Sequence, residues 1–442
     1  MNRLIATLAL IATMAASASA QEGLNMPYSQ FGLGTSDMPY NLPTATRMGG
    51  VVLTRSGDNF INPFNPASYA SIGMESFVFD MGANIQFTTL ANNGTSARDI
   101  DGNIGYLMVG LPVTRWMKVA GGLMPYTSTD YQSTYTASDP SYGTVKNIYG
   151  GTGGTSLVFL GAAFNILNNP EGHRLQAGFN VGYLTGRIQR AISYSFQGTD
   201  TTHFMHSRRL RETSAGNFLF DLGLQYWHPL GERYTLGVGL TYKPARNMSV
   251  DDKALIYTYR PSDQSPIDTV FPLAGDSPEF TSTAKQDHTF GIGLSLERNK
   301  KWLVAADASF AGWSGLAYEE GGTTPIFGTD ALRTGPWSRY ALGFEKIGTM
   351  DASTYWGRIS WSAGLHTEQG AMRLFLDGQE QVVNEWGFGL GAALPMHKGR
   401  SLLTISLGYS SLGNKDLLQR DCFTVGIAIS SCERWFVKRK YN

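Results

Sequence analysis

Residues 77–87 alternate apolar and polar side chains, and this period of two constrains the fold more than any other feature of the sequence. Odd positions are apolar throughout, from Phe77 to Phe87, whereas Asp80, Asn84 and Gln86 stand at even positions. A β-strand sends successive side chains to opposite faces. One face of this segment therefore suits lipid and the other suits a wet lumen, as in a transmembrane barrel. A strand of a soluble sandwich shows the same alternation, so the number of such segments decides.

Segments of this kind recur along most of the chain, and we predict about fourteen strands. Many exceed the nine to eleven residues that cross a membrane, so we expect the excess to project beyond it. The predicted strands are 75–89, 102–112, 116–128, 154–166, 173–187, 205–228, 233–250, 280–298, 301–317, 334–347, 354–367, 380–395, 400–412 and 420–431.

The connections between these segments alternate in length. After even-numbered strands they are tight: 112–115, 167–172, 229–232, 299–300, 348–353 and 396–399. After odd-numbered strands they are mostly long and polar: 90–101, 129–153, 188–204, 251–279, 318–333, 368–379 and 413–419. Short periplasmic turns that alternate with long outer loops are typical of outer-membrane barrels, with both chain ends in the periplasm. Because an open sheet leaves two edges unpaired in hydrocarbon, the first strand must pair with the last.

Aromatic residues near the strand ends suit the girdles that flank the apolar band of such a barrel. They are Trp116, Tyr226, Trp227, Trp302, Trp313, Trp337, Trp356 and Trp386.

Residues 1–20 have the pattern of a secretory signal peptide. Arg3 is the positive residue, an apolar stretch runs from Leu4 to Met14, and small residues at 18–20 form a cleavage site before Gln21. No later run of 18 apolar residues predicts a transmembrane helix. Lys+Arg and Asp+Glu balance at 35 each, so charge gives no reason to expect a nucleic-acid partner. We therefore expect an exported protein of the bacterial outer membrane, with its barrel over 74–442.

Residues 21–73 do not fit the strand pattern, because prolines and glycines punctuate them. Two fates are open: a plug folded into the barrel, or a periplasmic segment. A barrel of fourteen strands has a lumen wider than side chains alone can fill, which favours the plug. Within it, we expect Asn65, Pro66 and Ala67 to form a structural latch, since Pro66 fixes φ and the short amide of Asn65 can bond within a turn.

Six motifs resemble, in order, those of the FadL family of outer-membrane transporters, in the form found in Bacteroidota. They are YSQFGLG at 28–34, RMGG at 47–50, NPFNPASY at 62–69, YGGTGG at 149–154, WS at 313–314 and ERWFVKRK at 433–440. The likeness covers nearly the whole mature chain. It implies a barrel of fourteen strands, an N-terminal hatch, and uptake of small hydrophobic molecules such as long-chain fatty acids.

The resemblance also implies a sideways exit at a kink in the third strand, where this chain has Gly121, Gly122 and Pro125. These residues could interrupt ladder bonds and open the wall, or only bend the barrel without a gate. No particular basic site for a ligand carboxylate stands out, so the substrate stays open.

A ligand pocket above the plug should be mostly apolar. Tyr28, Phe31 and Phe64 are candidates to line it, and packing against the barrel wall is the alternative.

Chemistry of other kinds is not indicated, and we predict no enzyme, no cofactor and no metal site. The seven His are scattered, and no Gly-x-Ser-x-Gly elbow appears. Cys422 and Cys432 lie about 33 Å apart if they share an extended strand, which favours two free thiols over a bridge. A basic cluster of Arg208, Arg209 and Arg211 could contact outer-membrane lipid through lipopolysaccharide phosphates, or carry ordinary loop charge.

An alternative function keeps the barrel but not the transport. Relatives of the FadL family in Bacteroidota act as barrel subunits of envelope machines, in type 9 secretion or barrel assembly. Exposed apolar patches on loops mark partner surfaces. Loop 251–279 carries such residues in a polar stretch, among them Ile256, Tyr257, Tyr259 and Ile267.

Overall fold

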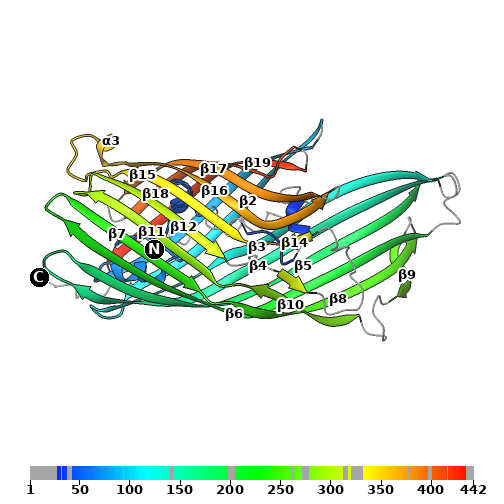
Figure 1. Ribbon diagram of the computed structural model, residues 1–442, viewed down its shortest axis with the longest axis horizontal. Helices are drawn as coiled ribbons and strands as arrows, with labels where there is room; N and C mark the ends of the chain where they lie inside the picture. The colour runs from blue at the N-terminus through cyan, green and yellow to red at the C-terminus, as the bar shows by residue number, and fades with distance from the viewer. Residues whose placement is uncertain are drawn as a thin grey trace, which may run out of the picture.

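Figure 1 shows a computed structural model of the protein. It describes residues 27–30, 32–36, 42–92, 94–139, 143–197, 205–260, 263–270, 278–311, 317–319, 332–376, 379–396, 401–415 and 417–434. The signal peptide, Phe31 and Trp313 lie outside these residues.

Four short helical turns and nineteen strands make up this part of the chain. The turns are η1 (Pro27–Gln30), α2 (Pro43–Thr46) and η2 (Pro66–Ser71), and a fourth, α3 (Tyr355–Arg358), lies between strands. The strands are β1 (Ser76–Asn92), β2 (Thr95–Pro112), β3 (Met117–Asp139), β4 (Gly143–Asn168), β5 (Arg174–Gln197), β6 (His206–Leu230), β7 (Tyr234–Lys243), β8 (Arg246–Arg260), β9 (Asp263–Val270), β10 (Glu279–Gln286), β11 (Thr289–Arg298), β12 (Trp302–Ala311), β13 (Ala317–Glu319), β14 (Leu332–Thr334), β15 (Trp337–Lys346), β16 (Ser360–Leu376), β17 (Gln379–Met396), β18 (Ser401–Leu412) and β19 (Gln419–Arg434).

These strands form one closed antiparallel barrel of fourteen wall positions, as predicted. Four positions are each made of two successive strands: β7 with β8, β10 with β11, β12 with β13, and β14 with β15. β9 only extends β8 as a hairpin. The barrel closes where β1 pairs with β19, from Ser76 opposite Arg434 to Ala91 opposite Gln419. Closure leaves no sheet edge along that junction, which a membrane requires.

The facing predicted for 77–87 is confirmed. Ile85 and Phe87 point outward and are 48% and 42% exposed, whereas Asp80, Asn84 and Gln86 are buried inside. The same outward belt of Phe, Leu and Ile side chains follows the other strands, which makes the outer surface suitable for lipid. We expected water in the lumen beside β1, but protein fills it there. Asn84 is only 2% exposed, because α2 packs on the inner face of β1.

Several strands are longer than the sequence indicated. The predicted loop 129–153 is mostly the upper part of β3 and β4, and the predicted loops 188–204 and 251–279 begin as continuations of β5 and β8. In Figure 1 these extended strands, with β9, reach one end of the barrel, and α3 lies at the other end. α3 also replaces the start of the predicted strand 354–367.

The aromatic girdle is confirmed only in part. Trp116, Trp356 and Trp386 are exposed on the outer surface. Trp227 is instead buried and faces inward, with the guanidinium of Arg174 4.7 Å from its ring centroid.

Both cysteines are free thiols, as predicted. Among the described residues, no helix has the length and apolar character to span a membrane.

Candidate functional site

The turn at 65–67 fixes the N-terminal segment, defined here as residues 27–73, against the barrel wall. Asn65 caps η2, and its side-chain oxygen accepts a hydrogen bond from the backbone N–H of Ala67 at 3.2 Å. Its amide nitrogen donates to Leu53 O at 2.8 Å and to Leu224 O on β6 at 3.3 Å. Gly223 permits this approach, since a Cβ there would lie 2.1 Å from the Asn65 oxygen. The structure thus places Asn65, Pro66 and Ala67 in a buried turn on the wall.

A buried ion-pair cluster holds the segment nearer its start. Arg47 and Arg55 each place a guanidinium nitrogen 2.7 Å from a different carboxylate oxygen of Glu345 on β15. All three side chains are less than a tenth exposed. Burial lowers the pKa of Arg47, while the charge of Glu345 opposes that shift. Arg47 also donates to the hydroxyl of Ser362 at 3.0 Å, so its charge is partnered on two wall strands.

The backbone of the same segment is bound by polar side chains of the wall. Asp307 on β12 accepts from the N–H groups of Val52 at 2.6 Å and Leu53 at 2.8 Å. Arg339 on β15 donates to the carbonyl oxygen of Gly50. Irregular backbone inside a membrane barrel needs such partners, because lipid offers none.

The candidate pocket residues lie in packed surroundings. Tyr28 is buried, and its hydroxyl donates to Leu418 O at 2.5 Å. Burial raises the pKa of Tyr28 to about 12. Phe64 packs beside the main buried cluster and borders a cavity of about 10 Å³, large enough for no more than a water. Phe31 is outside the described residues.

The wall between β2 and β3 is paired over only part of its height. Their ladder runs from Pro112 opposite Lys118 to Leu107 opposite Leu123 and ends there. Both strands continue well beyond that point, β2 along β1 and β3 along β4. Beyond Leu107 and Leu123, on the side away from the tight turn that joins them, β2 and β3 are therefore not paired with each other.

Pro125 stands two residues beyond the last pair of that ladder, and the register of β3 against β4 shifts between Pro125 and Thr127. Proline has no N–H to donate, and a bulge bends a strand. Gly121 and Gly122 lie instead within the ladder, opposite Val109 and Met108. Of the three residues singled out by sequence, Pro125 is thus the one at the interruption.

The N-terminal segment covers part of this interruption. Thr35 and Ser128 on β3 exchange both backbone hydrogen bonds, at 3.0 and 2.9 Å. Because Ser128 directs both groups to Thr35, they point away from β4 and toward the side of β2. The N–H of Asp130 donates to the Ser29 hydroxyl at 3.2 Å, and Arg190 donates to Gly32 O at 2.6 Å.

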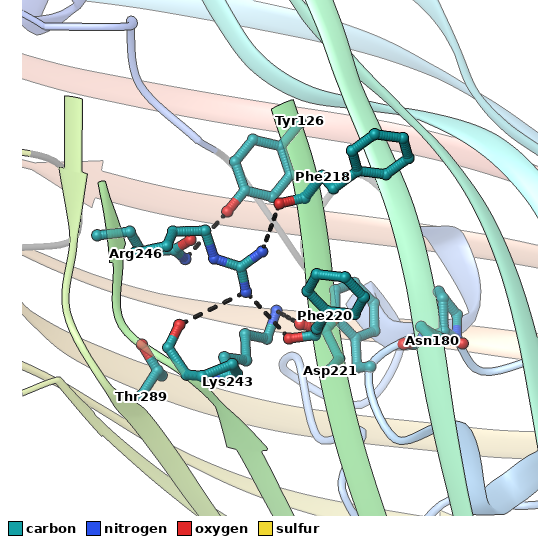
Figure 2. A network of polar contacts seen from close by, with 12 residues as sticks. Tyr126, Asn180, Phe218, Phe220, Asp221, Lys243, Arg246 and Thr289 are labelled. Atoms are coloured by element: carbon teal, nitrogen blue, oxygen red, sulfur yellow. Dashed lines mark hydrogen bonds and ion pairs between the residues drawn. The ribbon is translucent and has the colours of Figure 1, made fainter. Parts of the chain in front are cut away.

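A second interruption, not predicted from the sequence, lies between β6 and the pair β7–β8. The ladder stops at Leu222 opposite Tyr242 and resumes at Ala215 opposite Val250. In between, the Arg246 side chain donates to the carbonyl oxygens of Phe218 at 2.9 Å and Phe220 at 3.0 Å (Figure 2). A side chain thus replaces ladder bonds in the wall. Pro244 inside the predicted strand 233–250 was the available signal.

Charged and polar groups gather behind Arg246 in the lumen. Lys243 lies 3.8 Å from Asp221, and Figure 2 shows Tyr126 pointing toward the same cluster. The amide of Gln286 on β10 donates to the Tyr126 hydroxyl at 3.3 Å. Tyr126 sits at the register shift of β3, so this contact links the two wall interruptions across the lumen.

The basic cluster at 208–211 is only partly available to lipid. Arg211 is buried and paired with Asp252 through two bonds of 3.0 and 2.9 Å, so it fits neither of the two alternatives, contact with lipopolysaccharide phosphate or ordinary loop charge. His206 is buried at the start of β6, and its ring packs on Tyr259. No group of three or more metal-ligating side chains occurs within the described ranges.

Comparison with known proteins gives one family and a set of similar folds. A family model described as BamG matches residues 1–442. A comparison with curated proteins gives no match. Similar solved structures include the CymD monoaromatic hydrocarbon channel, with 13% identity, a TM-score of 0.52, and coverage of 91% of this chain and 98% of CymD.

Two further structures are similar to the same degree. A Pseudomonas aeruginosa FadL homologue has 14% identity and a TM-score of 0.51, over 88% of this chain and 98% of its own. The Pseudomonas putida toluene transporter TodX has 12% identity and a TM-score of 0.52, over 89% and 97%. At these identities the likeness shows the fold, which is that of the FadL-type channels.

Proposed function

Because this chain belongs to the BamG family, we propose that it is a barrel subunit of an outer-membrane barrel-assembly complex, and that residues 27–73 close its lumen as a fixed plug. The name of the family suggests barrel assembly. The structural observation that supports a fixed plug is the buried cluster of Arg47, Arg55 and Glu345. Moving the segment would separate charges that are expensive to leave alone in a dry interior.

Purification from native membranes tests the assembly role. A tagged chain should bring down the other subunits of a barrel-assembly complex in fixed proportion. Depletion of the chain should lower the amounts of folded outer-membrane barrels. A chain that purifies alone, with folded barrels at normal levels after depletion, would contradict the proposal.

We further propose that both termini lie in the periplasm and that the tips of β3 and β4 are outside. Tyr135 near the tip of β3 is exposed, and Arg115 lies in the tight turn before β3. Thiol labelling of intact cells should modify Tyr135→Cys and spare Arg115→Cys. The opposite pattern would invert the topology.

Uptake of small hydrophobic molecules is the second candidate. It is favoured by the FadL-type fold and by the missing β2–β3 ladder at Pro125, where a sideways path into the membrane would have to open. In this function, residues 28–35 would have to leave the edge of β3 so that a molecule could pass.

A disulfide at that edge separates the two functions. Thr35 and Ser128 form a hydrogen-bonded antiparallel pair, whose Cα atoms are about 5.5 Å apart, within the range a disulfide spans. Thr35→Cys/Ser128→Cys, in a chain with Cys422 and Cys432 replaced by Ala, should lock the segment. An assembly subunit will complement depletion equally well when oxidised or reduced. A transporter will lose uptake of radiolabelled fatty acids only when oxidised.

A further inference from the structure

An apolar groove of about 400 Å³ runs along the lipid-facing wall across β6, β7, β11 and β12. Outward-pointing side chains line it, and Gly223 and Gly291 form part of its floor. The main lining residues are Leu222, Leu240, Phe290, Ile292 and Phe310. Its volume is within the range of pockets that hold small ligands.

The groove ends at the wall interruption bridged by Arg246. Tyr242, the last β7 residue paired with β6, places its hydroxyl 2.8 Å from Nδ1 of His288. The backbone N–H of Ala245 donates to the same nitrogen at 3.3 Å. Nδ1 of His288 therefore accepts hydrogen bonds, so the proton of the neutral ring is on Nε2, which is a donor beside the groove.

The interruption carries more positive than negative charge. On the lumen side, Lys243 and Asp221 pair with each other at 3.8 Å, which leaves the guanidinium of Arg246 as the excess charge in the wall. A guanidinium has five N–H groups. Three hydrogen bonds from Arg246 go to carbonyl oxygens, and its buried Nε has no partner among the described residues. Opposite charges attract more strongly beside the apolar band than in bulk water, so the arrangement favours an added anion.

The polarity of the site matches a lipid of the outer leaflet. β7 spans ten residues, which rise about 25 Å in a tilted barrel strand, the height of the apolar band. With the termini in the periplasm, as proposed above, the interruption lies at the outer boundary of that band. The groove extends from there toward the membrane centre. A lipid with its anionic head outward and its chains inward fits this direction.

We propose that the groove and the interruption form a binding site for the phosphorylated, acylated lipid A part of lipopolysaccharide. One acyl chain lies in the groove, and a phosphate binds the second N–H of Arg246 Nη1 and Nε2–H of His288. Guanidinium and phosphate are complementary in charge and geometry. The site needs the proposed topology but is independent of whether the barrel assembles proteins or transports small molecules.

Native mass spectrometry of the full-length protein from outer membranes tests the proposal. Arg246→Gln removes the charge, and Ile292→Trp fills the groove without touching Arg246. Leu390→Trp on β17 is the matched control, because Leu390 is also outward-facing and exposed. A heat-dependent shift in gel mobility checks that each variant folds. The wild-type chain and Leu390→Trp should retain lipid A, and the other two should retain about tenfold less.

Added lipids identify the ligand class. Delipidated protein is given lipid A, phosphatidylglycerol or phosphatidylcholine at equal concentrations. Preference for lipid A over both phospholipids supports the proposal. Equal binding of phosphatidylcholine, or better binding of phosphatidylglycerol, overturns it. Full retention of lipid A by both Arg246→Gln and Ile292→Trp also overturns it. If Arg246→Gln fails to fold, Ile292→Trp decides, since the hydrogen bonds of Arg246 to the wall stay intact.

Discussion

Glu345→Gln should release the N-terminal segment while the barrel stays folded. The substitution keeps the shape of the side chain but leaves Arg47 and Arg55 buried without their shared counter-charge. Removing one member of a buried ion-pair group costs about 3–5 kcal/mol. At 1.36 kcal/mol for each factor of ten, the open population of the segment should rise by roughly two to four orders of magnitude.

Thiol labelling measures this opening. A Ser68→Cys reporter, in a chain with the native cysteines replaced by Ala, is buried in η2 and reacts only when the segment leaves the wall. Glu380→Gln is the matched control. Glu380 pairs with Arg373 at 3.3 Å, but its side chain is 50% exposed, and such pairs contribute about 0–1 kcal/mol.

The size of the difference tests the reasoning. Equal labelling rates for Glu345→Gln and Glu380→Gln would refute the role of the buried cluster. Replacing Arg47, Arg55 and Glu345 together by Met should restore slow labelling, because well-packed apolar side chains often equal a buried ion group in stability. Fast labelling of that triple variant would show that the charges are needed for more than mutual compensation.

Three further changes have defined outcomes. Ile85→Arg should destabilise the barrel by about 2–4 kcal/mol in urea unfolding in lipid, whereas Tyr135→Arg, above the apolar band, should cost less than about 0.5 kcal/mol. Asn65→Ala leaves buried backbone groups without partners, so the free energy of opening the segment should fall by about 1–3 kcal/mol. The Ser68→Cys reporter should therefore be labelled faster. The pKa of Tyr28 is raised from 10.0 to about 12, so its stabilising effect is complete below pH 10 and is lost as the pH rises through 12. Labelling of the Ser68→Cys reporter should increase more steeply over that range with Tyr28 present than in the same chain with Tyr28→Phe.

The wall positions could be predicted from the sequence because lipid imposes a simple rule on them. Within the apolar band every second side chain must be apolar, and the tight turns are too short for anything but a hairpin. The ends of β3 and β4 were missed for the same reason. Above the band both faces of a strand meet water, so the alternation stops although the ladder continues.

The contacts that hold the N-terminal segment could be predicted only where they are local. The hydrogen bond from the N–H of Ala67 to the Asn65 side chain spans two residues, and the Asn-Pro pair in the sequence predicts such a turn. Arg47 and Glu345 are 298 residues apart, and nothing in the sequence marks them as partners. Asn84 was assigned to a wet face because its own strand does not reveal what fills the lumen.

The two wall interruptions show what a barrel needs when its ladder fails. In hydrocarbon each backbone N–H and C=O requires a partner, and a missing strand pair must be replaced by something else. At β3 the replacement is another backbone, that of Thr35, which belongs to the N-terminal segment and not to a wall strand. At β6 it is the guanidinium of Arg246, which satisfies carbonyl oxygens but brings a charge with it. The first solution uses a segment that is not a wall strand, and the second places a positive charge in the wall. The sideways path that uptake would require and the proposed binding of an anionic lipid therefore belong to different positions of the same wall.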